Sequence, residues 1–322
     1  MKGLAIAAGL VAASGALIVA GFAAVRAQAS AEQLTGALVA AELRARPAEP
    51  TKPAAAAAQS APAVAGVSAP APAAVAPAPS PVSFRQTNTY NGNVVYVPHD
   101  CATEYDVVLH FHGAHPYVKD LAEKAQLHAV VVVYNAGNGA ERYAQAFQAG
   151  GILTSLLKQI AMAVAPLCGG DSAKPRRIAL SAWSAGYGAT EKLIARVEGR
   201  DRIDAVLLAD GLHAGFADVY RRQFAPNALQ AFRDFGELAK RGEKLFAITH
   251  SSIGTDGYAS TTECSKLLLK ALNVPAEGAQ VSGKSGDFSI EGSTGDDKAA
   301  HIAQFRQMDT ALYSKLRARW SR

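Results

Sequence analysis

A serine between small residues is the position in this chain best suited to nucleophilic chemistry. Residues 177–188 read Arg-Ile-Ala-Leu-Ser-Ala-Trp-Ser-Ala-Gly-Tyr-Gly, with an apolar run ahead of Ser184 and a helical pattern after it. A strand, a sharp turn and a helix around a serine form a nucleophile elbow, a strained turn that exposes the hydroxyl. Only small residues fit two positions before and after that serine, and here they are Ala182 and Gly186. The same residues also fit an ordinary strand-to-helix turn, so the rest of the sequence is needed to distinguish a nucleophile elbow from such a turn.

Three further polar residues come after predicted strands. Asp210 comes directly after an apolar strand, Asp256 lies beyond the next strand, and His301 lies after the last one. In an open parallel sheet, ligands bind beyond the carboxyl ends of the strands, so these side chains are expected near Ser184. Serine, aspartate and histidine also occur along the chain in the order that a nucleophile-elbow sheet presents them.

The elements that must position these residues alternate from about Ser83 to Arg322. Apolar runs predict strands at residues 94–97, 105–111, 130–134, 178–182, 205–209, 244–249 and 287–291. Helical spacing predicts helices at residues 152–167, 190–197, 228–241 and 261–272, and a C-terminal helix with Ile302, Phe305, Met308 and Leu312 on one face. This alternation predicts an α/β fold, with a mostly parallel central sheet and helices on both faces.

The first 82 residues differ from the rest in composition. Lys2 precedes an uncharged run, and Ala27-Gln28-Ala29 fits a cleavage site, so residues 1–29 are expected to be a signal peptide or a membrane anchor. Residues 30–82 are rich in alanine and proline and are predicted to be a largely disordered linker. Residues 83–322 form the predicted catalytic domain. The sequence therefore predicts an exported protein, periplasmic or extracellular, with membrane contact only through an uncleaved N-terminal segment.

The region from about 83 to 322 resembles the α/β-hydrolase family. The residues that carry the resemblance are His110-Phe111-His112-Gly113 at the end of a central strand, Ala182-Trp183-Ser184-Ala185-Gly186, and His301 before the closing helix. Secreted bacterial esterase-like members with a Ser-Ala-Gly-Tyr-Gly elbow are the most similar in character. The resemblance implies the α/β-hydrolase fold and a serine hydrolase that acts through an acyl-enzyme intermediate.

Each candidate residue then has an expected role. Ser184 is the nucleophile, His301 accepts its proton, and a carboxylate fixes the imidazole tautomer. The oxyanion needs two backbone donors. The resemblance assigns them to the N–H of Ala185, directly after the serine, and to the N–H of Ala114, in the loop after His112-Gly113.

The sequence offers two main candidates for the acid, Asp210 and Asp256. Asp256 comes after the strand where the family most often places its acid, but an aspartate between glycines is also ordinary turn chemistry. Asp210 ends a wholly apolar strand, where a charge is costly unless a partner uses it. Asp210 is therefore the predicted acid, with Asp256 as the alternative, and Asp296 and Asp297 fit helix caps better.

Cofactor and nucleic-acid functions find little support in the sequence. His110, His112 and His115 have no nearby carboxylate to complete a metal site, so no metal and no cofactor are predicted. Residues 278–285 match the phosphate-loop pattern letter for letter, but no buried strand precedes them and no helix comes after them. The formal net charge of +5 is mild, and no patch combines arginine with aromatic residues, which argues against a nucleic-acid partner.

The chain has three cysteines, and export permits disulfides. In the family's sheet order, the strand after Cys101 and the strand after Cys168 are neighbours. The resemblance therefore implies a Cys101–Cys168 disulfide, with Cys264 as a buried free thiol.

The expected function is the cleavage of a carboxylic ester, either a small molecule or a polymer. The long connection between Asp210 and Lys244 leaves room for a modest cap and an open cleft. Two alternatives remain open. One is a peptidase or acyltransferase on the same triad, and the other is an inactive binding protein that keeps the α/β-hydrolase fold.

Overall fold

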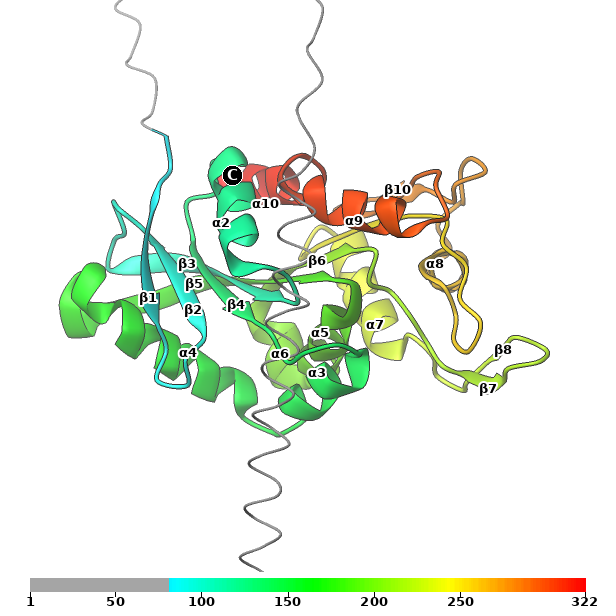
Figure 1. Cartoon of the computed structure of the whole chain (residues 1–322), viewed down its shortest axis with the longest axis horizontal. Helices are drawn as coiled ribbons and strands as arrows, with labels where there is room; N and C mark the ends of the chain where they lie inside the picture. The colour runs from blue at the N-terminus through cyan, green and yellow to red at the C-terminus, as the bar shows by residue number, and fades with distance from the viewer. Residues whose placement is uncertain (1–80) are drawn as a thin grey trace, which may run out of the picture. The chain divides into compact units, whose positions relative to one another are not determined.

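A nine-stranded sheet runs through residues 81–322, the part of the chain that the computed structural model describes (Figure 1). The predictions for the export signal and for nearly all of the linker lie outside these residues. The strands are β1 (Phe84–Asn88), β2 (Val94–Pro98), β3 (Glu104–Phe111), β4 (Val130–Tyr134), β5 (Lys174–Trp183), β6 (Ile203–Ala209), β9 (Leu245–His250), β10 (Gly283–Ser285) and β11 (Phe288–Gly292). They lie in the order β1-β2-β4-β3-β5-β6-β9-β11-β10.

The middle of this sheet is parallel and its edges are antiparallel. Strands β4, β3, β5, β6, β9 and β11 pair in parallel, each with its neighbour. At one edge β1 and β2 run antiparallel, and at the other β10 does. The predicted fold class, a mostly parallel sheet, is therefore confirmed. Because the parallel strands share one direction, their carboxyl ends lie side by side along one rim of the sheet, perpendicular to the edge strands; we call this rim the carboxyl edge.

Helices cover both faces of the sheet, as predicted. They are α2 (His115–Lys124), α3 (Ala140–Phe147), α4 (Ile152–Val164), α5 (Tyr187–Ile194), α6 (Val197–Arg202), α7 (Gln230–Lys240), α8 (Thr261–Ala271), α9 (Lys298–Arg306) and α10 (Ser314–Trp320). A π-helical turn at Asp309–Tyr313 joins α9 to α10.

Two apolar cores lie between these layers, one on each face. Side chains alternate along β3, so that Val107, Leu109 and Phe111 enter one core and Val108 enters the other. The first core contains buried residues of α3, α4, α5, α7 and α8, and the second contains those of α2, α9 and the C-terminal helix. All of β4, Val130–Tyr134, is buried, which explains its uninterrupted apolar sequence.

Several elements escape the sequence patterns. The patterns do not predict β1, α2, α3 or β10, and α2 begins at His115. The helix expected from Thr190 begins at Tyr187 and ends at Ile194, and Val197 begins the separate short helix α6. Residues 278–285 form a turn that leads into the edge strand β10, which pairs with β11 in a hairpin.

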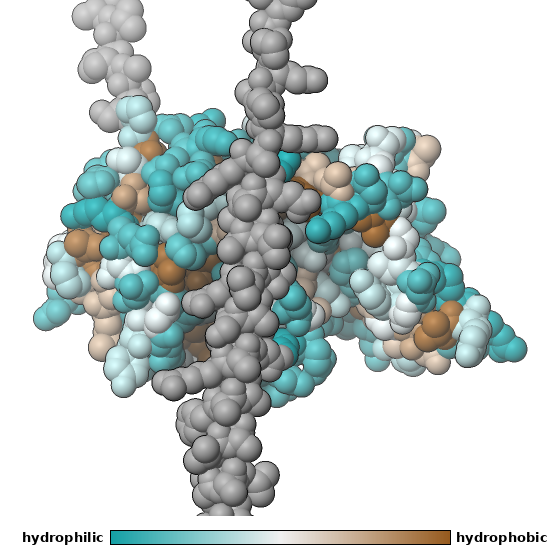
Figure 2. All heavy atoms as spheres, viewed as in Figure 1, coloured by the Kyte–Doolittle hydropathy of each residue, from teal (hydrophilic) through white to brown (hydrophobic). Residues whose placement is uncertain are grey.

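The long connection after Asp210 contains a small hairpin, β7 (Phe216–Asp218) and β8 (Gln223–Phe224), which projects from the body in Figure 1. Val219 and Tyr220 are exposed between its strands. On the part of the face that grey atoms leave visible, hydrophobic residues appear as scattered spots and not as one broad patch (Figure 2).

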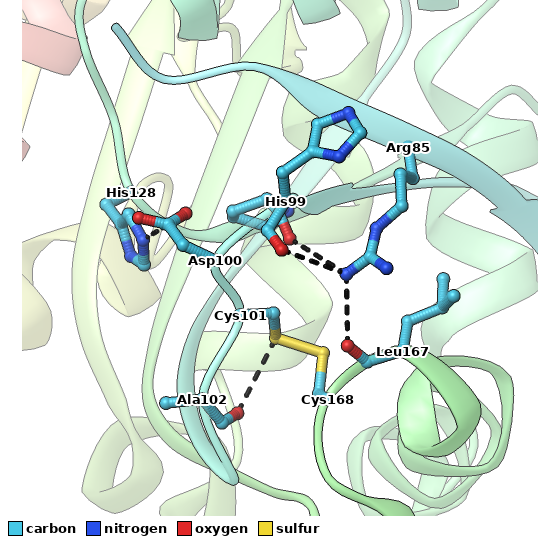
Figure 3. Close-up of a disulfide and its surroundings, with 9 residues drawn as sticks. Arg85, His99, Asp100, Cys101, Ala102, His128, Leu167 and Cys168 are labelled. Carbon is cyan, nitrogen blue, oxygen red and sulfur yellow. Dashed lines mark hydrogen bonds and ion pairs between the residues drawn. A yellow bond between two sulfur atoms is a disulfide. The ribbon is translucent and has the colours of Figure 1, made fainter. Parts of the chain in front are cut away.

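The predicted disulfide is present. Cys101 and Cys168 are bonded, with their Cα atoms 5.0 Å apart, and they close 67 residues of chain between the segments that precede β3 and β5 (Figure 3). Arg85 from β1 reinforces this junction, because its guanidinium donates to the carbonyls of His99 and Leu167 at 3.2 and 3.0 Å. Cys264 is free and buried, as predicted.

No single helix within residues 81–322 is long and apolar enough to cross a membrane. The segments Ala140–Phe147 and Ile152–Leu167 would pass by length and composition together, but they are bent by 86° relative to each other.

Candidate active site

Ser184 lies at the turn between β5 and α5, in the strained conformation that the motif predicts. Its φ of 49° is in the left-handed region, which residues other than glycine rarely adopt. Gly186 makes this turn possible, because a Cβ there would lie 2.1 Å from the carbonyl oxygen of Phe111 in the neighbouring β3. Ala182 is fully buried. The close approach of the elbow to β3 therefore requires small residues on both sides of the serine.

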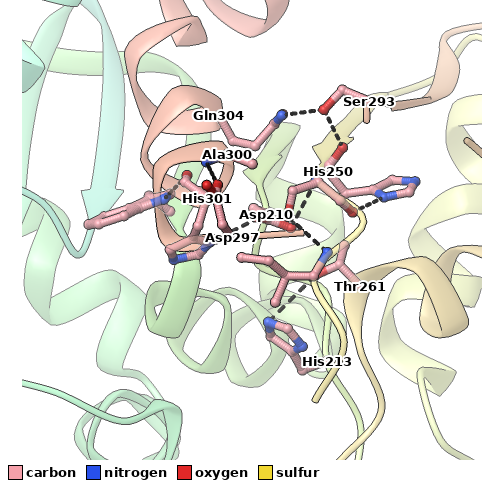
Figure 4. A network of polar contacts seen from close by, with 12 residues as sticks. Asp210, His213, His250, Thr261, Ser293, Asp297, Ala300, His301 and Gln304 are labelled. Atoms are coloured by element: carbon pink, nitrogen blue, oxygen red, sulfur yellow. Dashed lines mark hydrogen bonds and ion pairs between the residues drawn. The ribbon is translucent and has the colours of Figure 1, made fainter. Parts of the chain in front are cut away.

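Asp210 and His301 meet at the carboxyl edge of the sheet, although they are far apart in the sequence. Asp210 comes directly after β6, and His301 lies on α9 (Figure 4). Nδ1 of His301 is 2.8 Å from Oδ2 of Asp210. The carboxylate is an acceptor only, so Nδ1 carries a hydrogen, and in the neutral imidazole Nε2 has the lone pair. The imidazole is thus held in the tautomer that can accept a proton.

A third residue, Ser251, completes the surroundings of the carboxylate. Its backbone N–H donates to Oδ1 of Asp210 at 3.2 Å, and its hydroxyl donates to Oδ2 at 2.5 Å. Burial alone raises the pKa of the Asp210 carboxyl. The hydrogen bonds from His301 and Ser251, together with the charge of His301, outweigh burial and hold the pKa below its ordinary value. Asp210 is therefore a buried carboxylate whose two oxygens both accept hydrogen bonds.

The alternative acid lies elsewhere. Asp256 is exposed, in the loop after β9, and the charge that it faces is that of Arg222. Asp297 is the N-cap of α9, where its side chain accepts the N–H of Ala300 at 2.8 Å. Of the aspartates weighed from the sequence, Asp210 is the one that the structure brings into contact with His301.

The helix that carries His301 is anchored at both of its sides. The indole N–H of Trp183 donates to the carbonyl of His301 at 3.2 Å, and the Trp183 ring stacks on that of Phe305 at 4.8 Å. The amide of the buried Gln304 donates to Ser293 Oγ at 2.8 Å, and Ser293 in turn donates to the carbonyl of His250 at the end of β9 (Figure 4). Trp183 directly precedes Ser184, so one side chain joins the elbow to the histidine helix.

The glycine after Asp210 brings that loop close to the serine. A Cβ on Gly211 would lie 2.7 Å from the carbonyl oxygen of Ser184 and 3.1 Å from its nitrogen. The backbone after β6 therefore packs directly on the backbone of the elbow, with no side chain between them. Ser184, Asp210 and His301 thus belong to segments that contact one another.

The two residues predicted to supply oxyanion donors follow β5 and β3, which are neighbouring strands. Ala185 is in the first turn after β5, and Ala114 is the N-cap of α2, after the loop that ends β3. Neither backbone N–H donates a hydrogen bond to any residue between 81 and 322. By contrast, the N–H of Gly113 donates to Oδ1 of Asn135 at 3.0 Å.

The histidines near β3 have structural partners. His110 is fully buried, its Nε2 lies 3.1 Å from the carbonyl of His112, and its Nδ1 lies 3.0 Å from Ser181 Oγ and 3.2 Å from the Tyr313 hydroxyl. Burial lowers the pKa of His110 to about 3. His112 stacks on Trp183 at 5.2 Å, and burial, with a contribution from the charge of His301, lowers its pKa to about 4. Both rings are therefore neutral at pH 7. Among the described residues, no group of three or more His, Cys, Asp or Glu side chains could hold a metal ion.

Sequence reasoning missed Ser251 and Asn135. Each comes directly after a parallel strand, β9 in one case and β4 in the other. That position is the signal that could have found them, because polar residues at the carboxyl ends of parallel strands line the site edge.

Three features of this region point to the same fold. They are the strand order, the elbow after β5, and the order of serine, aspartate and histidine along the chain. Residues 81–322 have the α/β-hydrolase fold. No family model and no curated protein matches the sequence.

Solved structures resemble the chain only distantly. A poly(3-hydroxybutyrate) depolymerase from Bordetella parapertussis is 13% identical, with a TM-score of 0.41, and the match covers 70% of this chain and 89% of that one. Esterase LipW from Mycobacterium marinum is 14% identical, with a TM-score of 0.39 and coverage of 73% and 82%. An esterase from Pyrococcus furiosus is 10% identical, with a TM-score of 0.39 and coverage of 74% and 92%. Similarity at this level does not identify the chemistry, which is therefore judged from the site itself.

Two hollows in the surface lie away from this site. One of about 30 Å³ lies beside the disulfide, and one of about 210 Å³ is lined by residues of α5, α6 and α7 and of the loop before α7. Neither is lined by Ser184, Asp210 or His301. The contacts of Ser184, Asp210 and His301, and not the size of a hollow, therefore mark the candidate site.

Proposed function

We propose that this protein is an exported serine hydrolase that cleaves a carboxylic ester through an acyl-enzyme intermediate. The observation that carries the proposal is the 2.8 Å contact between His301 Nδ1 and Asp210 Oδ2, beside a serine with a φ of 49°. A buried carboxylate, an imidazole oriented by it and a strained serine on adjoining segments form the constellation that acyl transfer requires.

The reaction steps depend on the roles of the three side chains. Nε2 of His301 accepts the proton of the Ser184 hydroxyl as its oxygen attacks the ester carbonyl. Asp210 stabilises the imidazolium that forms, and the imidazolium then protonates the departing alcohol. Water, deprotonated by the same imidazole, attacks the acyl-enzyme, and the release of the acid restores Ser184.

The oxyanion of each tetrahedral intermediate is stabilised by two backbone N–H groups, those of Ala185 and Ala114. Both lack an acceptor within residues 81–322, so both are available to a substrate. Each donor contributes about 3 kcal/mol to lowering the barrier.

The proposed substrate is a small-molecule or polymeric ester. Tyr187, three residues after Ser184, and the half-exposed Tyr258 both contact the ring of His213, with centroid distances of 5.4 and 5.2 Å. His213 lies close enough to Asp210 and His301 to be influenced by their charges, so this aromatic group is near the candidate site and suits the apolar part of an ester. The Cys101–Cys168 disulfide supports export, because disulfides persist in oxidising compartments.

The test is covalent labelling by a fluorophosphonate probe, and then turnover. We expect the wild-type protein to be labelled and both Ser184→Ala and His301→Ala to lose the label. Folded wild-type protein that resists labelling would favour an inactive binding protein. Hydrolysis of p-nitrophenyl esters but not of peptide anilides separates an esterase from a peptidase, and transfer of the acyl group to an added alcohol in preference to water would indicate an acyltransferase.

A further inference from the structure

Nearly all of the backbone N–H and carbonyl groups in the loop after β3 are hydrogen-bonded. The carbonyl of His112 accepts from Nε2 of His110 at 3.1 Å, and the carbonyl of Ala114 accepts the N–H groups of Tyr117 and Val118 at 3.0 and 3.1 Å. Both backbone groups of Gly113 are paired with a single side chain. Of the backbone N–H and carbonyl groups of residues 113 and 114, only the N–H of Ala114 has no hydrogen-bond partner within residues 81–322.

The side chain that holds Gly113 is Asn135, directly after β4. Its Oδ1 accepts the N–H of Gly113 at 3.0 Å, and its Nδ2 donates to the carbonyl of Gly113 at 2.9 Å. An amide offers a donor and an acceptor at this spacing, so it pairs with one residue as a neighbouring strand would. β4 and β3 are paired up to Tyr134 and Phe111, and Asn135 extends that pairing beyond the end of the sheet.

Gly113 is also fixed from its other side. Its φ of 153° is one that residues with a side chain rarely adopt, and a Cβ there would lie 2.8 Å from Phe305 and 3.1 Å from His110. The rings of Phe305 and His110 leave no room for Gly113 to move on one side, and Asn135 hydrogen-bonds both of its peptide groups. The peptide that follows, which carries the N–H of Ala114, therefore has little freedom to rotate.

We propose that Asn135 is a positioning residue for the oxyanion hole, which aims the N–H of Ala114 at the reacting carbonyl through its two hydrogen bonds to Gly113. This inference rests on the proposed serine-hydrolase function. Asn135 itself is exposed, so its two hydrogen bonds contribute little to stability and their main effect is on the direction of one catalytic donor.

The experiment compares Asn135→Ala and Asn135→Asp with the wild-type protein. We expect Asn135→Ala to lower kcat for a p-nitrophenyl ester by about 100-fold, with KM near its wild-type value and an unchanged Tm, because the lost alignment matters only in the transition state. Asn135→Asp can still accept from Gly113 N–H but cannot donate to its carbonyl, and its charge repels the oxyanion. It should therefore lose at least as much.

The matched control is Asn138→Ala, an exposed asparagine in the same connection, which should keep the wild-type kcat. Affinity for a boronic acid that forms a tetrahedral adduct on Ser184 should fall in Asn135→Ala by a factor similar to that in kcat, a change that a purely structural role would not produce.

The inference is wrong if Asn135→Ala keeps its kcat, or if only its KM rises. It is also wrong if Asn138→Ala loses as much activity. Failure of the proposed function looks different, because wild-type protein would then neither turn over esters nor react with the fluorophosphonate, whatever residue stands at position 135.

Discussion

Replacing Asp210 by asparagine should stop catalysis while leaving the shape of the site intact. In the wild type, Oδ1 accepts the backbone N–H of Ser251, and Oδ2 accepts both the Ser251 hydroxyl and His301 Nδ1. An asparagine has only one oxygen for these two positions. If its NH2 group faced the Ser251 backbone, two donors that cannot rotate away would meet, at a cost of about 1–3 kcal/mol.

The opposite orientation costs less. The Ser251 hydroxyl can rotate and become an acceptor, and His301 can move its hydrogen from Nδ1 to Nε2. We therefore expect the asparagine NH2 to face His301 and to select the tautomer that cannot accept the proton of Ser184. The wrong tautomer lowers kcat by about 10⁴-fold in triads of this kind, equivalent to about 5.4 kcal/mol of barrier.

The assay is kcat for a p-nitrophenyl ester in Asp210→Asn and in Asp256→Asn, with Tm measured for both. Asp256 is the matched control, because it is exposed and lies after a strand of the same sheet. We expect Asp256→Asn to keep its activity. A loss in Asp256→Asn as large as that in Asp210→Asn would refute the assignment of the acid, and an Asp210→Asn variant within tenfold of wild type would refute the tautomer argument.

Two further predictions concern stability. Removing the disulfide by replacing Cys101 and Cys168 with alanine should lower the free energy of unfolding by about 4 kcal/mol, since the bond closes 67 residues of chain, and urea denaturation with and without a reductant would detect this. Because burial lowers the pKa of His110 to about 3, the unfolded chain takes up a proton below pH 6.5 that the folded protein excludes. Stability should therefore fall with decreasing pH between about 6.5 and 3, by about 1.4 kcal/mol per unit from this group, and an unchanged slope in His110→Asn would contradict the assignment.

The layered fold could be predicted because its interior strands are marked twice, by their apolar runs and by the polar or glycine residues at their ends. β4 and the part of β6 from Ala205 to Ala209 read as uninterrupted apolar segments, which is what burial on both faces requires. The edge strand β1 has half-buried and exposed residues throughout, so nothing in its composition separates it from a loop. Helix α3 begins after two glycines with positive φ and has only eight residues, too short for a clear helical repeat.

The site could be predicted as far as strand ends reveal it. Ser184 and Asp210 come directly after strands, and sheet topology brings such positions together. The sequence pattern places His301 before the closing helix, but it lies on α9, beyond the last strand. Ser251 and Asn135 occupy the same kind of position, but serine and asparagine at strand ends are also common turn residues. The sequence offers no way to know that one binds a carboxylate and the other a glycine backbone, because both contacts cross between neighbouring strands, to residues 41 and 22 positions away along the chain.

Trp183 illustrates what spacing along a chain cannot convey. Core packing is the usual role of such a residue, yet its ring contacts His112 of the loop after β3, Phe305 of α9 and the imidazole of His301, with centroids 5.2, 4.8 and 5.0 Å away. One side chain therefore joins the elbow, the loop and the histidine helix. A substitution there would displace all three parts at once, and its loss of activity could not be assigned to any of them. Among residues 81–322, the side chain of Asn135 is hydrogen-bonded to Gly113 alone. Ser251 binds the carboxylate of Asp210, and its hydroxyl otherwise accepts only the N–H of Ile253, within its own loop. These two peripheral residues are therefore better probes of the proposed mechanism than the tryptophan next to Ser184.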